Sequence, residues 1–102
     1  MDQEKGVTPT CVILAPTREL ASQIHLEAFK LSVGSTIRSV CLYGGSDMKR
    51  QLSELSFGCD IVIATPGRLN DMLSRGIISM SKVKYLAFDE GDRMLDMGFE
   101  VS

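Results

Sequence analysis

The 102-residue chain lacks tryptophan, a surplus of positive charge and any long apolar run. Its longest unbroken apolar runs span residues 11–15 and 61–64, far short of the roughly 18 residues that cross a bilayer. The polar start MDQEKG contains no signal-peptide core. Eleven basic residues against thirteen acidic ones give a net charge of −2, which excludes a histone-like or basic-tail binder. We therefore expect one cytosolic or nuclear domain, in which any nucleic-acid site is local.

Cysteine and histidine are also scarce, which argues against a disulfide framework and against a histidine ligand. Cys11, Cys41 and Cys59 cannot all pair, show no C-x-x-C spacing and lie within or beside apolar runs. We expect them to be small buried side chains in a reducing compartment. His25 is the single histidine, and we expect it at the surface or rim of the fold rather than as a ligand.

Four short runs rich in Val, Ile and Leu predict β-strands, at residues 11–15, 36–43, 60–65 and 84–90. Three of these runs are almost continuously apolar, as is typical of parallel strands that are covered on both faces. Between the runs, apolar residues recur at helical spacing, and each helical stretch ends at a glycine: Gly34, Gly58 and Gly76. The alternation predicts an α/β fold of doubly wound type, a parallel sheet with flanking helices and right-handed crossovers.

Two of the expected helices begin alike. Thr17-Arg18 follows the first strand, and Thr65-Pro66-Gly67-Arg68 follows the third, with threonine as the N-cap in both. Free backbone N–H groups, a hydroxyl and an arginine at the carboxyl end of a strand suit phosphate oxygens. At one junction, these residues would be read as an ordinary helix start without a ligand. Two such junctions in one sheet favour an anion site. Gly44-Gly45, directly after the second strand, allows either a plain turn or close approach of a sugar-phosphate chain.

The fourth strand ends in two carboxylates, Asp89 and Glu90. A rigid strand end can hold one carboxylate toward a Mg²⁺ shell and the next toward an attacking water. Alternatively, Asp89 or Asp92 caps a short helix and Glu90 is solvated. The phosphate loop G-x-x-x-x-G-K-[ST] that should accompany such a pair is absent, because the chain contains no Gly-Lys dipeptide.

Together, four segments resemble the first RecA-like lobe of a DEAD-box ATP-dependent RNA helicase: PTREL (16–20), GG (44–45), TPGRL (65–69) and DEGDRMLDMGF (89–99). The stretches APTRELASQI and RMLDMGFE are most similar to the Vasa-like branch of that family. The resemblance implies that residues 1–102 form a partial RecA-like (P-loop NTPase) lobe, without the phosphate loop and without everything after the DEGD segment. It also implies a cytoplasmic protein, with the nucleus or a perinuclear granule as alternatives.

The resemblance also implies roles for individual residues. Contacts to the sugar-phosphate backbone of RNA, largely independent of sequence, are implied for Thr17, Arg18, Gly44, Gly45, Thr65, Gly67 and Arg68. ATP and Mg²⁺ are the implied cofactors. Asp89 would hold Mg²⁺ through water, Glu90 would orient and polarise the attacking water, and Asp92 would couple the ATP site to a second helicase lobe. The implied function is that of a fragment of an ATP-dependent RNA helicase that is inactive alone.

Two departures and two alternatives accompany this interpretation. Gly91 stands where the family has alanine, and the glutamine motif, the Ser-Ala-Thr motif and the second lobe are missing. The chain could instead be a truncated, non-catalytic module that binds RNA or a partner protein. A receiver-like or flavodoxin-like domain is a third reading, but it predicts no arginine-bearing anion sites at two other strand ends. Because the RecA-like order leaves one side of residues 85–88 open, we also expect the isolated chain to be marginally folded and to self-associate.

Overall fold

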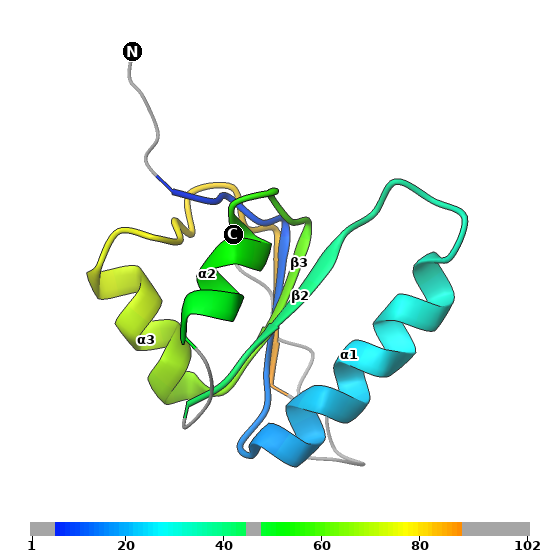
Figure 1. The fold of residues 1–102 in the computed structure, drawn as a ribbon, viewed down its shortest axis with the longest axis horizontal. Helices are drawn as coiled ribbons and strands as arrows, with labels where there is room; N and C mark the ends of the chain where they lie inside the picture. The colour runs from blue at the N-terminus through cyan, green and yellow to red at the C-terminus, as the bar shows by residue number, and fades with distance from the viewer. Residues whose placement is uncertain (1–5, 45–47, 89–102) are drawn as a thin grey trace.

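A computed structural model describes residues 6–44 and 48–88 of the chain. Strands and helices alternate along these residues (Figure 1) in the order β1 (Cys11–Leu14), α1 (Arg18–Ser32), β2 (Ser39–Leu42), α2 (Met48–Leu55), β3 (Ile61–Ala64), α3 (Pro66–Ser74) and β4 (Tyr85–Phe88). The predicted α/β alternation is confirmed. The three glycines predicted to end the helices all have positive φ, 87° at Gly34, 85° at Gly58 and 74° at Gly76, a conformation that favours glycine at a helix C-terminus.

The strands are shorter than the apolar runs that predicted them. The clearest case is β2, which begins at Ser39 rather than at Thr36. The backbone N–H of Arg38 donates to a carboxylate oxygen of Asp60 at 2.9 Å, so a side chain takes the place of a strand partner there. The predicted run over residues 36–43 was therefore too long at its start.

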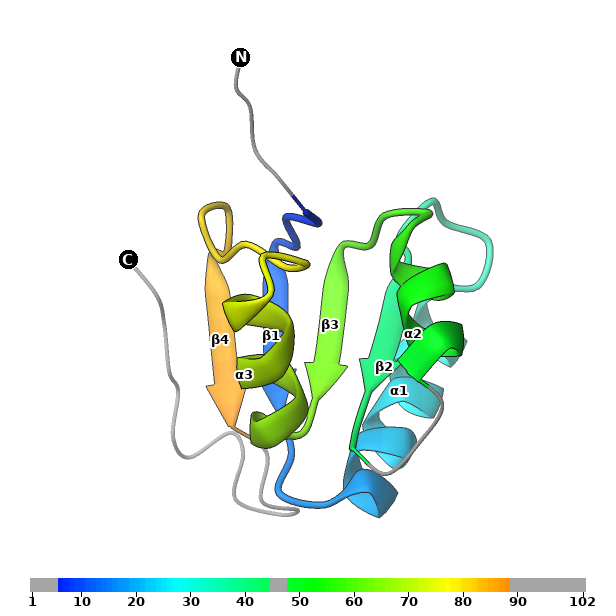
Figure 2. The ribbon, with the colours of Figure 1, turned by 60° about the vertical axis from the view of Figure 1, so that its left-hand side comes forward.

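All four strands are parallel and lie in the order β2-β3-β1-β4. Leu14, the last residue of β1, is in register with Ala64 on one side and Phe88 on the other, and Ala64 is in register with Leu42. The four strands therefore end at one edge of the sheet, which we call the carboxyl edge (Figure 2). β4 lies beside β1, and within the described part of the chain β1 is its single strand neighbour, so one side of β4 is open as expected.

Helices cover both faces of the sheet, with α1 on one face and α2 and α3 on the other (Figures 1 and 2). Ala21 of α1 is fully buried and packs with Ala15 and Ile63. On the opposite face, Leu55 of α2 and Met72 of α3 pack in a second cluster with residues of the strands. Alternate residues of β1, β2 and β3 thus face opposite clusters, which explains why these runs are apolar throughout. No helix in the described residues is long and apolar enough to cross a membrane.

Candidate nucleic-acid interface

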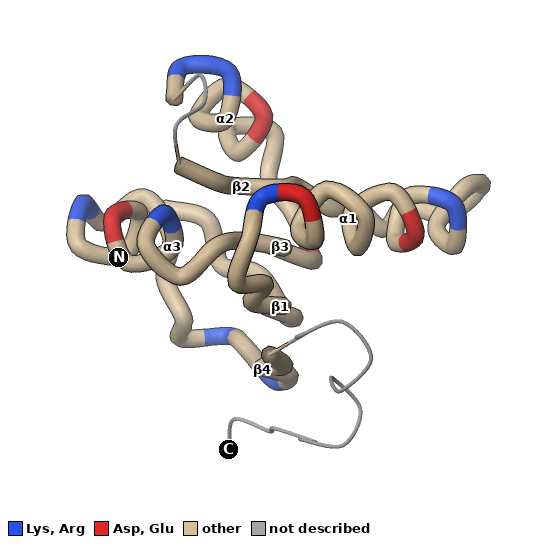
Figure 3. Tube along the Cα trace, turned by 90° about the horizontal axis from the view of Figure 1, so that it is seen from below, with Lys and Arg blue, Asp and Glu red and all other residues tan. Residues whose placement is uncertain are grey.

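The carboxyl edge brings together the starts of three helices. Because α1, α2 and α3 directly follow β1, β2 and β3, each helix begins at the edge where its strand ends. A helix start carries unpaired backbone N–H groups and a partial positive charge. Figure 3 views this end of the molecule and shows basic and acidic residues interspersed along the helices. The first turns of α2 and α3 contain no acidic residue, and that of α1 contains Glu19.

The two threonines at helix starts differ in what their hydroxyls do. Thr17 caps α1 as predicted, since its side-chain oxygen accepts from the backbone N–H of Leu20 at 3.1 Å. Thr65 also occupies the N-cap position, with Pro66 next in the helix, but its side chain makes no capping bond. The prediction of Thr65 as the N-cap residue is therefore confirmed in position, with Pro66 favouring the helix start through its fixed φ, but not in a side-chain bond. That hydroxyl remains available to a ligand.

Arg18, the exposed first residue of α1, lies over the ring of Tyr43, with Cζ 5.5 Å from the ring centroid. Tyr43 directly follows β2. When the face of a guanidinium stacks on a ring, its N–H groups point outward within the guanidinium plane. They can therefore still donate to phosphate oxygens. The start of α1 and the end of β2 are thereby joined at the carboxyl edge.

Arg68, in the first turn of α3, makes a comparable contact to the neighbouring helix. Its Nη1 donates to Sδ of Met48, the first residue of α2, at 2.8 Å. A thioether sulfur is a weak acceptor, so it orients the guanidinium without neutralising its charge. The remaining N–H groups of Arg68 can serve an anion at the edge.

Gly44 and Gly67 give this edge an open surface. Both are exposed, and an added Cβ at either position meets no atom within 4 Å. Neither has the positive φ that restricts a position to glycine. The fold therefore does not require glycine at these two positions, which is consistent with a requirement for close approach by a ligand.

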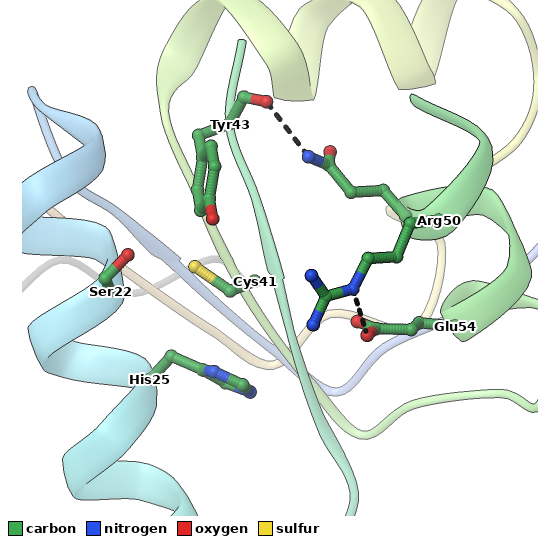
Figure 4. Close-up of a pocket in the computed structure, with 7 residues that line it drawn as sticks. Ser22, His25, Cys41, Tyr43, Arg50 and Glu54 are labelled. Atoms are coloured by element: carbon green, nitrogen blue, oxygen red, sulfur yellow. Dashed lines mark hydrogen bonds and ion pairs between the residues drawn. The ribbon is translucent and has the colours of Figure 1, made fainter. Parts of the chain in front are cut away.

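A small cavity of about 130 Å³ lies at the outer edge of β2, between α1 and α2 (Figure 4). His25 of α1 lines this cavity and is half-buried, in keeping with its predicted place at the surface or rim of the fold, and its Nε2 is 3.3 Å from the carbonyl oxygen of Ser39. On the other side, Nε2 of Gln51 donates to the carbonyl oxygen of Tyr43 at 3.1 Å. Burial, with a contribution from Glu54, raises the pKa of the Cys41 thiol to about 11. This thiol is therefore protonated and poorly nucleophilic at neutral pH.

All three cysteines are unpaired. Each is half-buried rather than fully buried. Burial raises the pKa of Cys11 and raises that of Cys59 to about 11, where Asp60 adds to the shift and Arg38 opposes it.

The structure places six of the predicted RNA-binding residues at the carboxyl edge, namely Thr17, Arg18, Gly44, Thr65, Gly67 and Arg68. The other predicted site residues lie outside the described residues: Gly45, Asp89, Glu90 and Asp92. Within residues 6–44 and 48–88, no group of three or more His, Cys, Asp or Glu side chains could hold a metal ion. The metal role predicted for Asp89 falls outside these residues and stays a prediction.

Sequence reasoning missed Tyr43, Met48 and Gln51 as parts of this edge. Their neighbours Gly44-Gly45 drew attention to the segment, but their contacts reach Arg18 and Arg68, 25 and 20 residues away along the chain. No local pattern signals contacts of that separation.

Comparison with known proteins agrees with this geometry. The DEAD/DEAH box helicase family model matches residues 1–102. The chain is 57% identical over 96 residues to the probable ATP-dependent RNA helicase ddx3 of Dictyostelium discoideum, covering 94% of this chain and 14% of that protein. The crystal structure of the yeast DEAD-box splicing factor Prp28 superimposes with a TM-score of 0.77 at 39% identity, covering 91% of this chain and 22% of that one.

These matches confirm the family resemblance and the RecA-like fold of the first lobe. They do not test the finer assignment to the Vasa-like branch, which stays a prediction. The chain spans less than a quarter of the length of either relative. With a family match along its whole length and the arginine-bearing helix starts in place at the carboxyl edge, the chain belongs to the DEAD/DEAH box helicase family.

Proposed function

We propose that this chain forms the RNA-facing part of the first lobe of an ATP-dependent RNA helicase. One RNA strand would lie along the carboxyl edge and be held by its sugar-phosphate backbone. The residues that would contact it are Thr17, Arg18, Gly44, Gly45, Thr65, Gly67 and Arg68. Backbone contacts fix the position of a strand without reading its bases, so binding would be largely independent of sequence.

One observation carries this proposal: both arginines at helix starts are held at the same sheet edge with N–H groups left for an anion. Arg18 makes no hydrogen bond or ion pair within the described residues, and the contact of Arg68 is to an uncharged sulfur. Structural arginines at a surface are commonly paired with carboxylates, as Arg75 is with Asp71 at 3.0 Å at the other end of α3. Unneutralised guanidiniums beside two helix N-termini favour phosphate binding.

The nucleotide chemistry would be shared with segments that supply a phosphate loop. ATP and Mg²⁺ are the cofactors of this proposal, with Asp89 toward the Mg²⁺ shell through water and Glu90 toward the attacking water. Asp92 would couple that site to a second lobe. Mg²⁺, when bound, neutralises charge on the phosphates, while Glu90 orients the water and receives its proton.

RNA binding is tested by fluorescence anisotropy with two short single-stranded RNAs of unrelated sequence. Arg18→Ala and Arg68→Ala should each weaken the affinity for both RNAs by about tenfold, because each removes charge-assisted hydrogen bonds to phosphate. Lys30→Ala is the matched control, since Lys30 lies in the last turn of α1, at the opposite end of the helix from Arg18. It should leave both affinities unchanged.

Two results would contradict the RNA proposal. One is an affinity that neither arginine variant changes. The other is a loss confined to one of the two RNAs, which would indicate base readout instead of backbone contacts.

ATP turnover tests the catalytic part of the proposal separately. The 102-residue chain should not hydrolyse ATP, because nothing in it cradles the triphosphate. In a helicase that carries this segment with a phosphate loop and a second lobe, Glu90→Gln should lower turnover and leave ATP affinity nearly unchanged. Unchanged turnover in that variant would show that Glu90 does not act on the water.

A further inference from the structure

Tyr43 occupies a junction at the carboxyl edge. It directly follows β2 and immediately precedes Gly44, and it is half-buried. Its ring lies under the guanidinium of Arg18 from α1, and its carbonyl oxygen accepts from Gln51 of α2. One residue therefore touches two helices that start at the edge, by its side chain and by its backbone respectively.

The ring contact constrains the one arginine of the edge that has no other polar partner among the described residues. The distance of 5.5 Å from Cζ to the ring centroid lies within the range of favourable cation–π contact. An exposed arginine side chain without such a contact samples many rotamers, and ordering it on binding costs free energy. A ring under the guanidinium reduces that cost in advance while leaving the N–H groups free.

The backbone of Tyr43 is fixed from the opposite side. Gln51 is 5% exposed, and its Nε2 donates to the Tyr43 carbonyl oxygen at 3.1 Å (Figure 4). Its Oε1 is buried and has no donor within the described residues. The hydrogen bond from Nε2 to Tyr43 is therefore the one hydrogen bond that this buried amide makes within the described residues.

We propose that Tyr43 is a positioning residue for RNA binding, held by Gln51, and that its ring holds the Arg18 guanidinium in the orientation that meets an RNA phosphate. This inference rests on the proposed function, since it assigns Arg18 to an RNA phosphate. It adds a residue that touches no RNA itself and acts through Arg18. The hydroxyl of Tyr43 is not needed for this role, whereas the ring is.

The test is a double-mutant cycle on RNA affinity, with the variants Arg18→Ala, Tyr43→Leu and both together. Tyr43→Leu should weaken the affinity about threefold, the size of an exposed cation–π contact, and should have no further effect in the Arg18→Ala background. Tyr43→Phe should bind as the parent chain does. Phe57→Leu is the matched control, because Phe57 lies under Arg38, 5.3 Å from Cζ to the ring centroid, beyond the C-terminal end of α2.

A second set of variants separates the loss of the ring contact from damage to the packing around position 43. Tyr43→Met replaces the ring by an unbranched, adaptable side chain and should also weaken binding about threefold. Arg18→Lys leaves position 43 untouched and keeps the charge, but an ammonium lacks the planar face that stacks on a ring. It should weaken binding by up to about threefold, as Tyr43→Leu does.

The outcomes separate this inference from the proposed function. Weaker binding by Arg18→Ala together with unchanged binding by Tyr43→Leu and Tyr43→Met overturns the role of Tyr43 and leaves the RNA site standing. So does an equal loss from Tyr43→Leu in the presence and absence of Arg18, or parental affinity in Arg18→Lys. If Arg18→Ala binds as the parent does, the assignment of Arg18 to RNA fails, and the role of Tyr43 fails with it.

Discussion

Nε2 of His25 lies 3.3 Å from the carbonyl oxygen of Ser39, on the side of β2 that faces away from the sheet. Carbonyl oxygens of Arg38 and Leu42 accept from β3 and from Thr65 after it. Because carbonyls alternate in direction along a strand, those of Ser39 and Tyr43, each next to one of these residues, point outward. Side chains of α1 and α2 cap both of these outward carbonyls. Two outward carbonyls of this edge are therefore already bonded, which makes it a poorer template for another strand.

His25→Ala should therefore lower the free energy of unfolding by about 1 kcal/mol, the net value of one hydrogen bond to the Ser39 carbonyl. Urea denaturation followed by circular dichroism measures this difference. Ser22→Ala is the matched control, because Ser22 is on the same helix and lines the same cavity. Equal midpoints for the two variants would show that the histidine contact does not stabilise the fold.

The opposite edge of the sheet is less protected. Tyr85 of β4 is 58% exposed. Apolar side chains are also exposed on α1, where Leu31 is 86% exposed. We expect the isolated chain to self-associate at micromolar concentration, as a strand edge and an apolar surface both favour. Sedimentation velocity of the parent, Tyr85→Lys and Leu31→Lys distinguishes the two routes, since a charge at the responsible surface should shift the chain toward monomer. A monomeric parent with a cooperative thermal transition would contradict the expectation.

The thiols of Cys41 and Cys59 make stability depend on alkaline pH. Their pKa values rise from the ordinary 9.0 to about 11 in the folded chain, mainly because burial penalises the thiolate. Between these two values the unfolded chain loses its thiol protons and the folded chain keeps them. Stability is therefore intact below pH 9 and falls as the pH rises toward 11.

The double variant Cys41→Ala/Cys59→Ala should lose part of this alkaline dependence. The measurement is the urea midpoint of each protein between about pH 7 and pH 11. The variant should start from a lower midpoint, because two core-lining side chains are shortened, and then decline less steeply than the parent. Parallel curves would indicate that the two thiols titrate alike in the folded and unfolded chains.

Gly67→Ala separates the stability of the fold from RNA binding. Gly67 is an exposed residue of α3 with open space where a Cβ would lie, so alanine should stabilise the helix by about 0.5 kcal/mol. The added methyl group would stand where a sugar-phosphate chain approaches, and RNA affinity should fall. Asn70→Ala, an exposed site further along the same helix, should stabilise the fold and leave RNA affinity unchanged. Equal RNA affinities for both variants would remove Gly67 from the site.

The sequence predicted features that depend on neighbouring residues. The helix stops at Gly34, Gly58 and Gly76 and the capping of α1 by Thr17 are local, because they involve backbone conformation or residues three positions apart. The alternation of strands and helices is likewise predicted by the spacing of apolar residues within short segments. These predictions are confirmed.

Features that depend on distant partners could not be predicted. The start of β2 is set by Asp60, 22 residues after Arg38, and the orientation of Arg18 depends on Tyr43. A local pattern also failed at Thr65, whose side chain makes no capping bond although threonine at an N-cap commonly makes one. The roles of Asp89, Glu90 and Asp92 rest on the family pattern and stay predictions.

The salt dependence of RNA affinity tests most directly whether the carboxyl edge binds RNA through its phosphates. The measurement compares the slope of log affinity against log salt concentration for the parent chain and the Arg18→Ala/Arg68→Ala double variant. Each phosphate contact on a single strand contributes about 0.7 to the slope, so the double variant should have a slope shallower by about 1.4. Equal slopes would mean that Arg18 and Arg68 neutralise no phosphate and would contradict the account.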